Sequence, residues 1–193
     1  PASIIAPAGT KATLTLGDGT VITLDTAGNG TLAQQGNTNI VKLKDGTLAY
    51  NPMQSENGKV FLNTITTPKG GHYQVLLPDG STVWLNAASS ITFPSAFTNN
   101  KREVKLSGEA YFEITKNKLM PFLVLVQQSV ITVLGTNFNV NAYYDEDHIN
   151  TTLLEGSVKF TSNNKEEKLK PGEQVSFTSA DGSMRVKQAD ISQ

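Results

Sequence analysis

Residues 73–85 have the sequence Tyr-Gln-Val-Leu-Leu-Pro-Asp-Gly-Ser-Thr-Val-Trp-Leu, and this stretch decides the fold class. Apolar and polar residues largely alternate on both sides of Pro-Asp-Gly-Ser, as they do in two strands that each bury one face. Asp-Gly suits the turn between the strands, because Gly accepts a positive φ and Asp can bond the backbone that follows it. The stretch therefore predicts a β-hairpin.

The same pattern occurs twice upstream. Residues 12–24 place Gly-Asp-Gly-Thr between two alternating stretches, and residues 40–50 place Lys-Asp-Gly-Thr between two more. Apolar residues at helical spacing are hard to find. We expect an all-β fold of antiparallel hairpins, forming a β-sandwich or a short β-helix-like stack. Further strands are expected near residues 91–93, 103–107, 109–115, 121–127, 129–134, 137–144, 149–154, 156–161 and 174–178, and an exposed hairpin tip at 163–168.

Composition narrows the classes of function. The chain has 16 Lys and Arg against 17 Asp and Glu, without the basic surplus with which nucleic-acid binders neutralise phosphates. It has no cysteine, which excludes disulfides, thiol catalysis and cysteine-ligated metals. The longest strongly apolar run, residues 122–126, is far shorter than the roughly 20 residues that span a bilayer. We expect neither a nucleic-acid partner nor a membrane span within these residues.

Charged residues and histidines offer three candidate sites. Glu109 and Glu113 flank Tyr111 on one face of an expected strand, but two strand positions four apart lie about 13 Å from each other, too far for a glycosidase pair. Residues 145–148 gather three acids and a histidine, and His72 follows two glycines. Neither has the spacing of a metal site, so we expect a charged turn at 145–148 and neither metal nor cofactor.

Five aromatic side chains could form a platform for sugars or could pack within and across strands. They are Trp84, Tyr73, Tyr111, Tyr143 and Tyr144. Packing is the expected role. The alternative is a non-catalytic carbohydrate-binding β-sandwich, which needs Trp84 and either Tyr73 or Tyr143 exposed on one face. A glycan-cleaving β-helical enzyme would instead need carboxylates converging within about 10 Å. No nucleophile-elbow or phosphate-loop motif occurs, so the residues favour a non-enzymatic binding module.

Five blocks of sequence resemble the FecR family, in the family's order. They include Leu-Pro-Asp-Gly-Ser-Thr-Val-Trp-Leu-Asn, Leu-Ser-Gly-Glu-Ala-Tyr-Phe-Glu-Ile and Val-Leu-Gly-Thr-Asn-Phe-Asn-Val. The blocks lie at 70–90, 106–114, 133–143, 152–158 and 169–174. The segment before them resembles the region between membrane and domain in FecR versions from Bacteroidetes.

The resemblance, with the weaker pattern around 52–67, implies three parts of the chain. An N-terminal β segment is expected at 1–64, a FecR-type periplasmic domain at 65–188, and the start of a C-terminal lobe at 189–193. The family's cytoplasmic sigma-binding segment and membrane helix are not among these residues.

The resemblance also implies an anti-sigma factor of the cell-surface signalling type. Such proteins hold an extracytoplasmic-function (ECF) sigma factor through a short cytoplasmic segment and cross the inner membrane with one helix. Their periplasmic part senses the signalling domain of a TonB-dependent outer-membrane transporter, whose substrate is a glycan or an iron chelate. The implied role is non-enzymatic, in the periplasm, and regulates transcription of transport genes.

One block carries candidate chemistry. In some relatives a Gly-Thr bond is broken by autoproteolysis, in which the threonine hydroxyl attacks the preceding carbonyl. The corresponding pair is Gly135 and Thr136. We expect no catalytic residue in the chain, and self-cleavage at this pair is the alternative. Partner contact by β-augmentation is expected at an exposed strand edge, such as 121–127 or 137–144.

Overall fold

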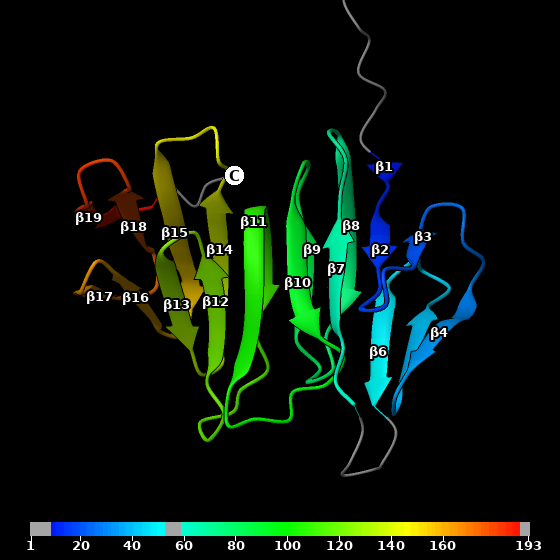
Figure 1. Cartoon of the computed structure of the whole chain (residues 1–193). Helices are drawn as coiled ribbons and strands as arrows, with labels where there is room; N and C mark the ends of the chain where they lie inside the picture. The colour runs from blue at the N-terminus through cyan, green and yellow to red at the C-terminus, as the bar shows by residue number, and fades with distance from the viewer. Residues whose placement is uncertain (1–8, 53–58, 190–193) are drawn as a thin grey trace, which may run out of the picture.

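The computed structural model describes residues 9–52 and 59–189, which form nineteen strands and no helix (Figure 1). In this part of the chain, accordingly, no helix could cross a membrane. The strands pair into two layers, which we call layer I and layer II. The expectation of an all-β fold is confirmed.

Layer I runs from β3 at one end to β17 at the other. In spatial order its strands are β3 (Val21–Thr23), β2 (Thr13–Thr15), β7 (Leu62–Thr66), β10 (Ser90–Pro94), the first half of β11 (Arg102–Glu113), β12 (Phe122–Val126), β13 (Ser129–Val133), β16 (Val158–Ser162) and β17 (Lys165–Leu169).

Layer II runs alongside, from β4 to β19. Its strands are β4 (Gly30–Gln35), β5 (Thr38–Lys42), β6 (Leu48–Pro52), β8 (Gly71–Leu76), β9 (Thr82–Leu85), the second half of β11, β14 (Asn137–Ala142), β15 (His148–Glu155), β18 (Glu173–Thr178) and β19 (Ser183–Gln188). The short β1 (Gly9–Thr10) pairs with the start of β8.

The three Asp-Gly turns form as the sequence predicts. In each, the glycine amide donates to a leucine carbonyl three residues earlier, and the aspartate Oδ1 accepts from the amide two residues on. The three aspartates are Asp18, Asp45 and Asp79. The hairpins β2–β3, β5–β6 and β8–β9 are therefore set locally, by the side chain that precedes each glycine.

Strand β11 joins the two layers. Its residues 102–107 pair in layer I and its residues 108–113 pair in layer II. Gly108 lies at the crossing with φ +86, and a Cβ there would be 2.4 Å from the Ser89 Oγ atom. The sequence predicts two strands separated by this glycine. The structure has one continuous strand, because glycine lets the chain change layers without ending the pairing.

Aromatic contacts between the layers close the core. Tyr50 of β6 meets Phe93 of β10 with ring centroids 4.9 Å apart, and Phe160 of β16 meets Phe177 of β18 at 5.9 Å. All four side chains are buried. Inward residues of both layers belong to one cluster of buried side chains, as in a sandwich.

Two local expectations need correction. Three strand pairings are parallel rather than antiparallel: β11–β12, β1–β8 and β6–β8. Residues 163–168 are not all a hairpin tip, because only Asn163 and Asn164 form the turn and 165–169 is the edge strand β17. Only Leu169 of this strand is buried, so β17 carries almost no apolar pattern to detect.

The division at residue 64 stays a prediction. The pairings β2–β7 and β6–β8 continue both layers across it.

Arg102 is the largest fully buried side chain of the described residues, with 1% of it exposed. Its Nη1 atom donates to Asp79 Oδ2 at 2.7 Å and to the Thr115 carbonyl at 2.8 Å, and its Nε atom donates to the Met120 carbonyl at 2.9 Å. Its guanidinium also lies over the Phe122 ring, 5.4 Å from the ring centroid. Arg102 thus fixes the loop between β11 and β12 against the β8–β9 turn.

Candidate functional site

An aromatic pair lies on the outer face of layer II. Trp84 of β9 and Tyr111 of β11 are direct cross-strand neighbours, and their ring centroids are 5.5 Å apart with planes tilted by 44°. Both are half-buried. Burial and the neighbouring Glu113 and Glu155 carboxylates raise the pKa of Tyr111, so its hydroxyl stays protonated at neutral pH.

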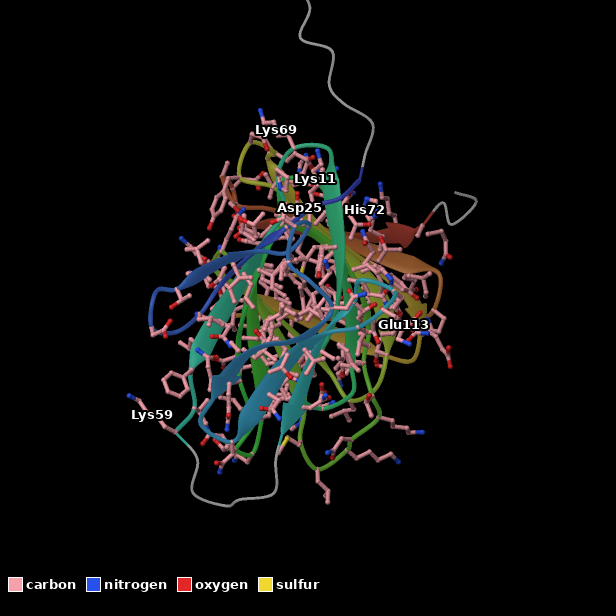
Figure 2. The ribbon with its side chains drawn as sticks, turned by 90° about the vertical axis from the view of Figure 1, so that its right-hand side faces the viewer. Lys11, Asp25, Lys59, Lys69, His72 and Glu113 are labelled. Atoms are coloured by element: carbon pink, nitrogen blue, oxygen red, sulfur yellow. The ribbon has the colours of Figure 1, made fainter. Side chains whose placement is uncertain are left out.

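Glu109 lies beside this pair and holds two carboxamides. Its Oε2 atom accepts from Asn86 Nδ2 at 2.7 Å, and its Oε1 atom accepts from Asn139 Nδ2 at 2.9 Å. Glu109, Tyr111 and Glu113 share one face of β11, as the sequence predicts, because they alternate with buried residues. Figure 2 shows Glu113 and His72 on the same side of the molecule.

Two shallow pockets of about 290 and 240 Å³ lie on this face. Both are lined by His72, Trp84 and Leu85. One extends to Asp45 in the β5–β6 turn, and the other extends to Glu109. Trp84 therefore stands where the two pockets meet.

The other predicted aromatics are placed differently. Tyr73 is buried and donates its hydroxyl to the Gly46 carbonyl at 2.7 Å, and burial together with Asp45 raises its pKa to about 12. Tyr143 is half-buried and donates to the Ala87 carbonyl at 2.8 Å, whereas Tyr144 is 71% exposed in the next turn. Only Trp84 and Tyr111, of these five, form a ring pair. The expectation that a carbohydrate platform needs Trp84 together with an exposed Tyr73 or Tyr143 is therefore not met, and the ring beside Trp84 is that of Tyr111.

The acidic run at 145–148 forms the turn between β14 and β15, as expected. His148 begins β15, with its Nδ1 atom 2.9 Å from Thr178 Oγ1. Among the residues with described positions, no three His, Asp or Glu side chains are grouped so that they could hold a metal ion.

The Gly135–Thr136 bond lies between β13 and β14. A Cβ at Gly135 would be 2.6 Å from the Lys116 Cα atom, so this backbone approach needs glycine. Thr136 is 4% exposed and its hydroxyl donates to the Ser157 carbonyl at 3.0 Å. A pocket of about 420 Å³ borders the bond, with Lys116, Lys159 and Lys168 in its lining.

The prediction that 121–127 and 137–144 offer free strand edges for β-augmentation is wrong. Strand β12 lies between β11 and β13, and β14 lies between β11 and β15, so both are paired on each side. Alternation in sequence reports which face is buried and not which strands are neighbours. In the described ranges 9–52 and 59–189, the outermost strands of the two layers are β3, β4, β17 and β19.

The amides around Glu109 were not predicted, although the sequence contains a signal for them. Asn137, Asn139 and Asn141 alternate with buried residues along β14, so their side chains all face outward from layer II. Asn86 follows Trp84 by two residues, which also places it on the outer side.

The family of the chain is shown by the match of its sequence to a family model. Residues 63–159 match the model described as "FecR protein". The chain belongs to the FecR family. The matched segment begins in β7 and ends in β16, so it contains both the Trp84–Tyr111 pair and the Gly135–Thr136 bond. The resemblance drawn from the five blocks of sequence is confirmed.

Solved structures agree with this membership. Two crystal structures, at 2.50 and 1.65 Å resolution, of a candidate anti-sigma factor from Parabacteroides distasonis ATCC 8503 are similar to this chain. Both are 34% identical to it, with TM-scores of 0.66 and 0.64. The matches cover 67% and 66% of this FecR chain but only 61% and 60% of the chains in those crystals. No curated protein sequence matches the chain.

Proposed function

We propose that this chain is the periplasmic sensing part of a transmembrane anti-sigma factor. It relays the occupancy of a TonB-dependent outer-membrane transporter to an ECF sigma factor and so regulates transcription of transport genes. The observation that carries the proposal is the FecR match over residues 63–159. The similarity to the Parabacteroides protein at 34% identity supports it further.

The role proposed for the chain toward its partners is protein contact rather than catalysis on a substrate. A continuous two-layer core with a half-buried, polar outer face suits a rigid module that another protein touches. The inner membrane anchor and the sigma-binding segment then belong to parts of the protein beyond the FecR domain. We retain the division into 1–64, 65–188 and the lobe that starts at 189–193 as part of this proposal.

The test is direct binding to a transporter. The chain and the full periplasmic region are immobilised separately, and the purified signalling domain of the TonB-dependent transporter encoded nearby is passed over each. We expect saturable binding to the full periplasmic region, at least about tenfold tighter than to the signalling domain of an unrelated transporter. No binding to the full periplasmic region would contradict the relay. Binding to that region but not to the chain would place the contact on the C-terminal lobe.

We further propose that the Gly135–Thr136 bond is a point of self-cleavage. The Thr136 hydroxyl oxygen attacks the Gly135 carbonyl carbon, the C–N bond breaks, and the hydroxyl proton passes to the freed amino group. Water then hydrolyses the resulting ester to a Gly135 carboxylate and restores the hydroxyl. A pocket adjoins this bond, and a Cβ at Gly135 would be 2.6 Å from the Lys116 Cα atom. This close approach distinguishes the bond from those after Gly19, Gly30 and Gly46, where a Cβ would have nothing within 4 Å.

Intact-mass spectrometry of freshly purified protein tests the cleavage. We expect a fragment pair split between 135 and 136, which disappears in Thr136→Val because valine keeps the shape and lacks the hydroxyl. Thr136→Ser should restore it. Thr132→Val, which changes a neighbouring lining residue of the same pocket, is the control and should cleave normally. A single uncleaved mass for the unmodified chain would remove the proposal.

A further inference from the structure

A row of side chains crosses the outer face of layer II around the aromatic pair. Strand register places six half-buried residues side by side, one from each of six strands, and they are Gln74, Trp84, Tyr111, Asn139, Thr152 and Gln174. The row combines two rings with three carboxamides and a hydroxyl. Neighbouring outward positions add Asn86, Asn141, Asn150 and Ser176.

This composition is unusual for a solvent-facing sheet, whose outer positions commonly carry Lys and Glu. Within layer II, the outward positions of β8, β9, β11, β14 and β15 carry no Lys or Arg. The charges near the rings are the carboxylates of Glu109, Glu113 and Glu155, and the imidazole of His72 lies beside Trp84. The face therefore disfavours an anionic ligand and offers donors and acceptors to a neutral, hydroxyl-rich one.

Hydrogen bonds between these side chains hold the polar groups in place. Each carboxylate oxygen of Glu109 accepts one hydrogen bond, Oε2 from Asn86 and Oε1 from Asn139. A carboxylate has about four acceptor positions, so each oxygen can accept a further hydrogen bond from a ligand hydroxyl. Gln174 Nε2 donates to Thr152 Oγ1 at 2.7 Å further along the row. Prearranged polar groups lose little conformational entropy when a ligand binds.

We propose that this face binds a neutral oligosaccharide, with a sugar ring on Trp84 and Tyr111 and its hydroxyls on Glu109 and Asn139. The two pockets that meet at Trp84 are each small for a ligand site, and as adjoining shallow subsites they suit two consecutive units of a chain rather than one enclosed molecule. The inference goes beyond the proposed function and does not rest on it, because the row of residues alone carries it.

The chain itself provides the reporter for a test. Trp84 is its only tryptophan, so the tryptophan emission of the protein reports on this face alone. The chain is titrated with cellohexaose, xylohexaose, mannohexaose and maltohexaose, each up to about 10 mM. We expect at least one of them to give a saturable change in emission and protection from acrylamide quenching, with a Kd of about 1 mM or tighter.

Variants that leave Trp84 in place locate the binding. Asn139→Ala and Tyr111→Ala should each weaken the affinity at least about tenfold, and Tyr111→Phe, which keeps the ring, should weaken it much less. Tyr144→Ala removes an exposed aromatic that lies outside the row and should leave the Kd unchanged. Circular dichroism shows whether each variant is folded. If Tyr111→Ala does not fold, the affinity of Asn139→Ala is the deciding measurement.

Three results would overturn the inference. The first is no saturable emission change with any of the four sugars. The second is a change that persists at full affinity in both Asn139→Ala and Tyr111→Ala, because the ligand would then bind elsewhere. The third is a response to hexalysine without one to the sugars, because it would assign the carboxylates to a basic peptide. Loss of transporter binding in the earlier experiment would leave all three outcomes unaffected.

Discussion

Replacing Arg102 with methionine is expected to lower the free energy of unfolding by about 3–5 kcal/mol, the usual cost of removing one partner of a buried ion pair. Methionine fills much of the arginine stem's space but cannot donate a hydrogen bond. The change leaves the Asp79 carboxylate, 12% exposed, without its cation. It also leaves the Thr115 and Met120 carbonyls without their donors.

The loss of stability should extend beyond the Arg102–Asp79 ion pair, because Asp79 also holds the β8–β9 turn. Its Oδ2 atom also accepts from the Ser81 hydroxyl at 2.6 Å, and Ser81 Oγ in turn accepts from the Thr115 amide at 3.0 Å. Arg102, Asp79 and Ser81 therefore tie the turn to the loop that follows β11. Removing one member of such a hydrogen-bond network weakens the bonds of the other members as well.

Urea unfolding monitored by circular dichroism measures the effect. Lys101→Met is the matched control, since Lys101 is the neighbouring cation and pairs with Glu103 at the surface. It should change stability by no more than about 1 kcal/mol. The double variant Arg102→Met with Asp79→Asn should cost less than the sum of the single changes, because no charge is left unpaired. A loss below about 1 kcal/mol for Arg102→Met would show that water reaches the pair.

The hairpins could be predicted from the sequence because the residues that determine each of them are close together in the chain. Alternation sets the buried face, and one aspartate and one glycine set each turn. Strand β7 escaped prediction because Asn63 takes an inward position, where it donates to Gln35 Oε1 at 2.6 Å and accepts from the Gly17 amide at 2.9 Å. A polar residue that is satisfied in the core interrupts the apolar pattern by which a strand is recognised.

The binding face could be predicted only in part. Alternation correctly places Glu109 and Tyr111 on one face of β11. The strands next to that face are β9, more than twenty residues before Glu109, and β14, about thirty residues after it. The register between two distant strands cannot be read from the sequence of either strand alone. The same limit explains why the strands expected at a free edge lie in the interior of their layers.

Replacing Gly108 with alanine is expected to cost about 2–5 kcal/mol, in two parts. Its φ of +86 is unfavourable for alanine by roughly 1–2 kcal/mol. The new Cβ atom would also lie 2.4 Å from Ser89 Oγ and 2.8 Å from Ser89 Cα, an overlap worth about 1–3 kcal/mol in a packed site. Ser89 is buried, and its hydroxyl accepts from the Glu109 amide and donates to the Ala87 carbonyl, so it cannot turn aside without losing both bonds.

Gly46→Ala separates the two parts of this cost. Gly46 has nearly the same φ, +88, but nothing lies within 4 Å of a Cβ placed there. The Gly46→Ala variant should therefore show the backbone cost alone. In urea unfolding, the free energy of unfolding of Gly108→Ala should be at least about 1 kcal/mol lower than that of Gly46→Ala. Equal losses for the two variants would mean that β11 crosses between the layers without needing the close contact with Ser89. In that case the position of Glu109 beside Trp84 and Tyr111 would have to be set by the register of β9 and β14 rather than by this glycine.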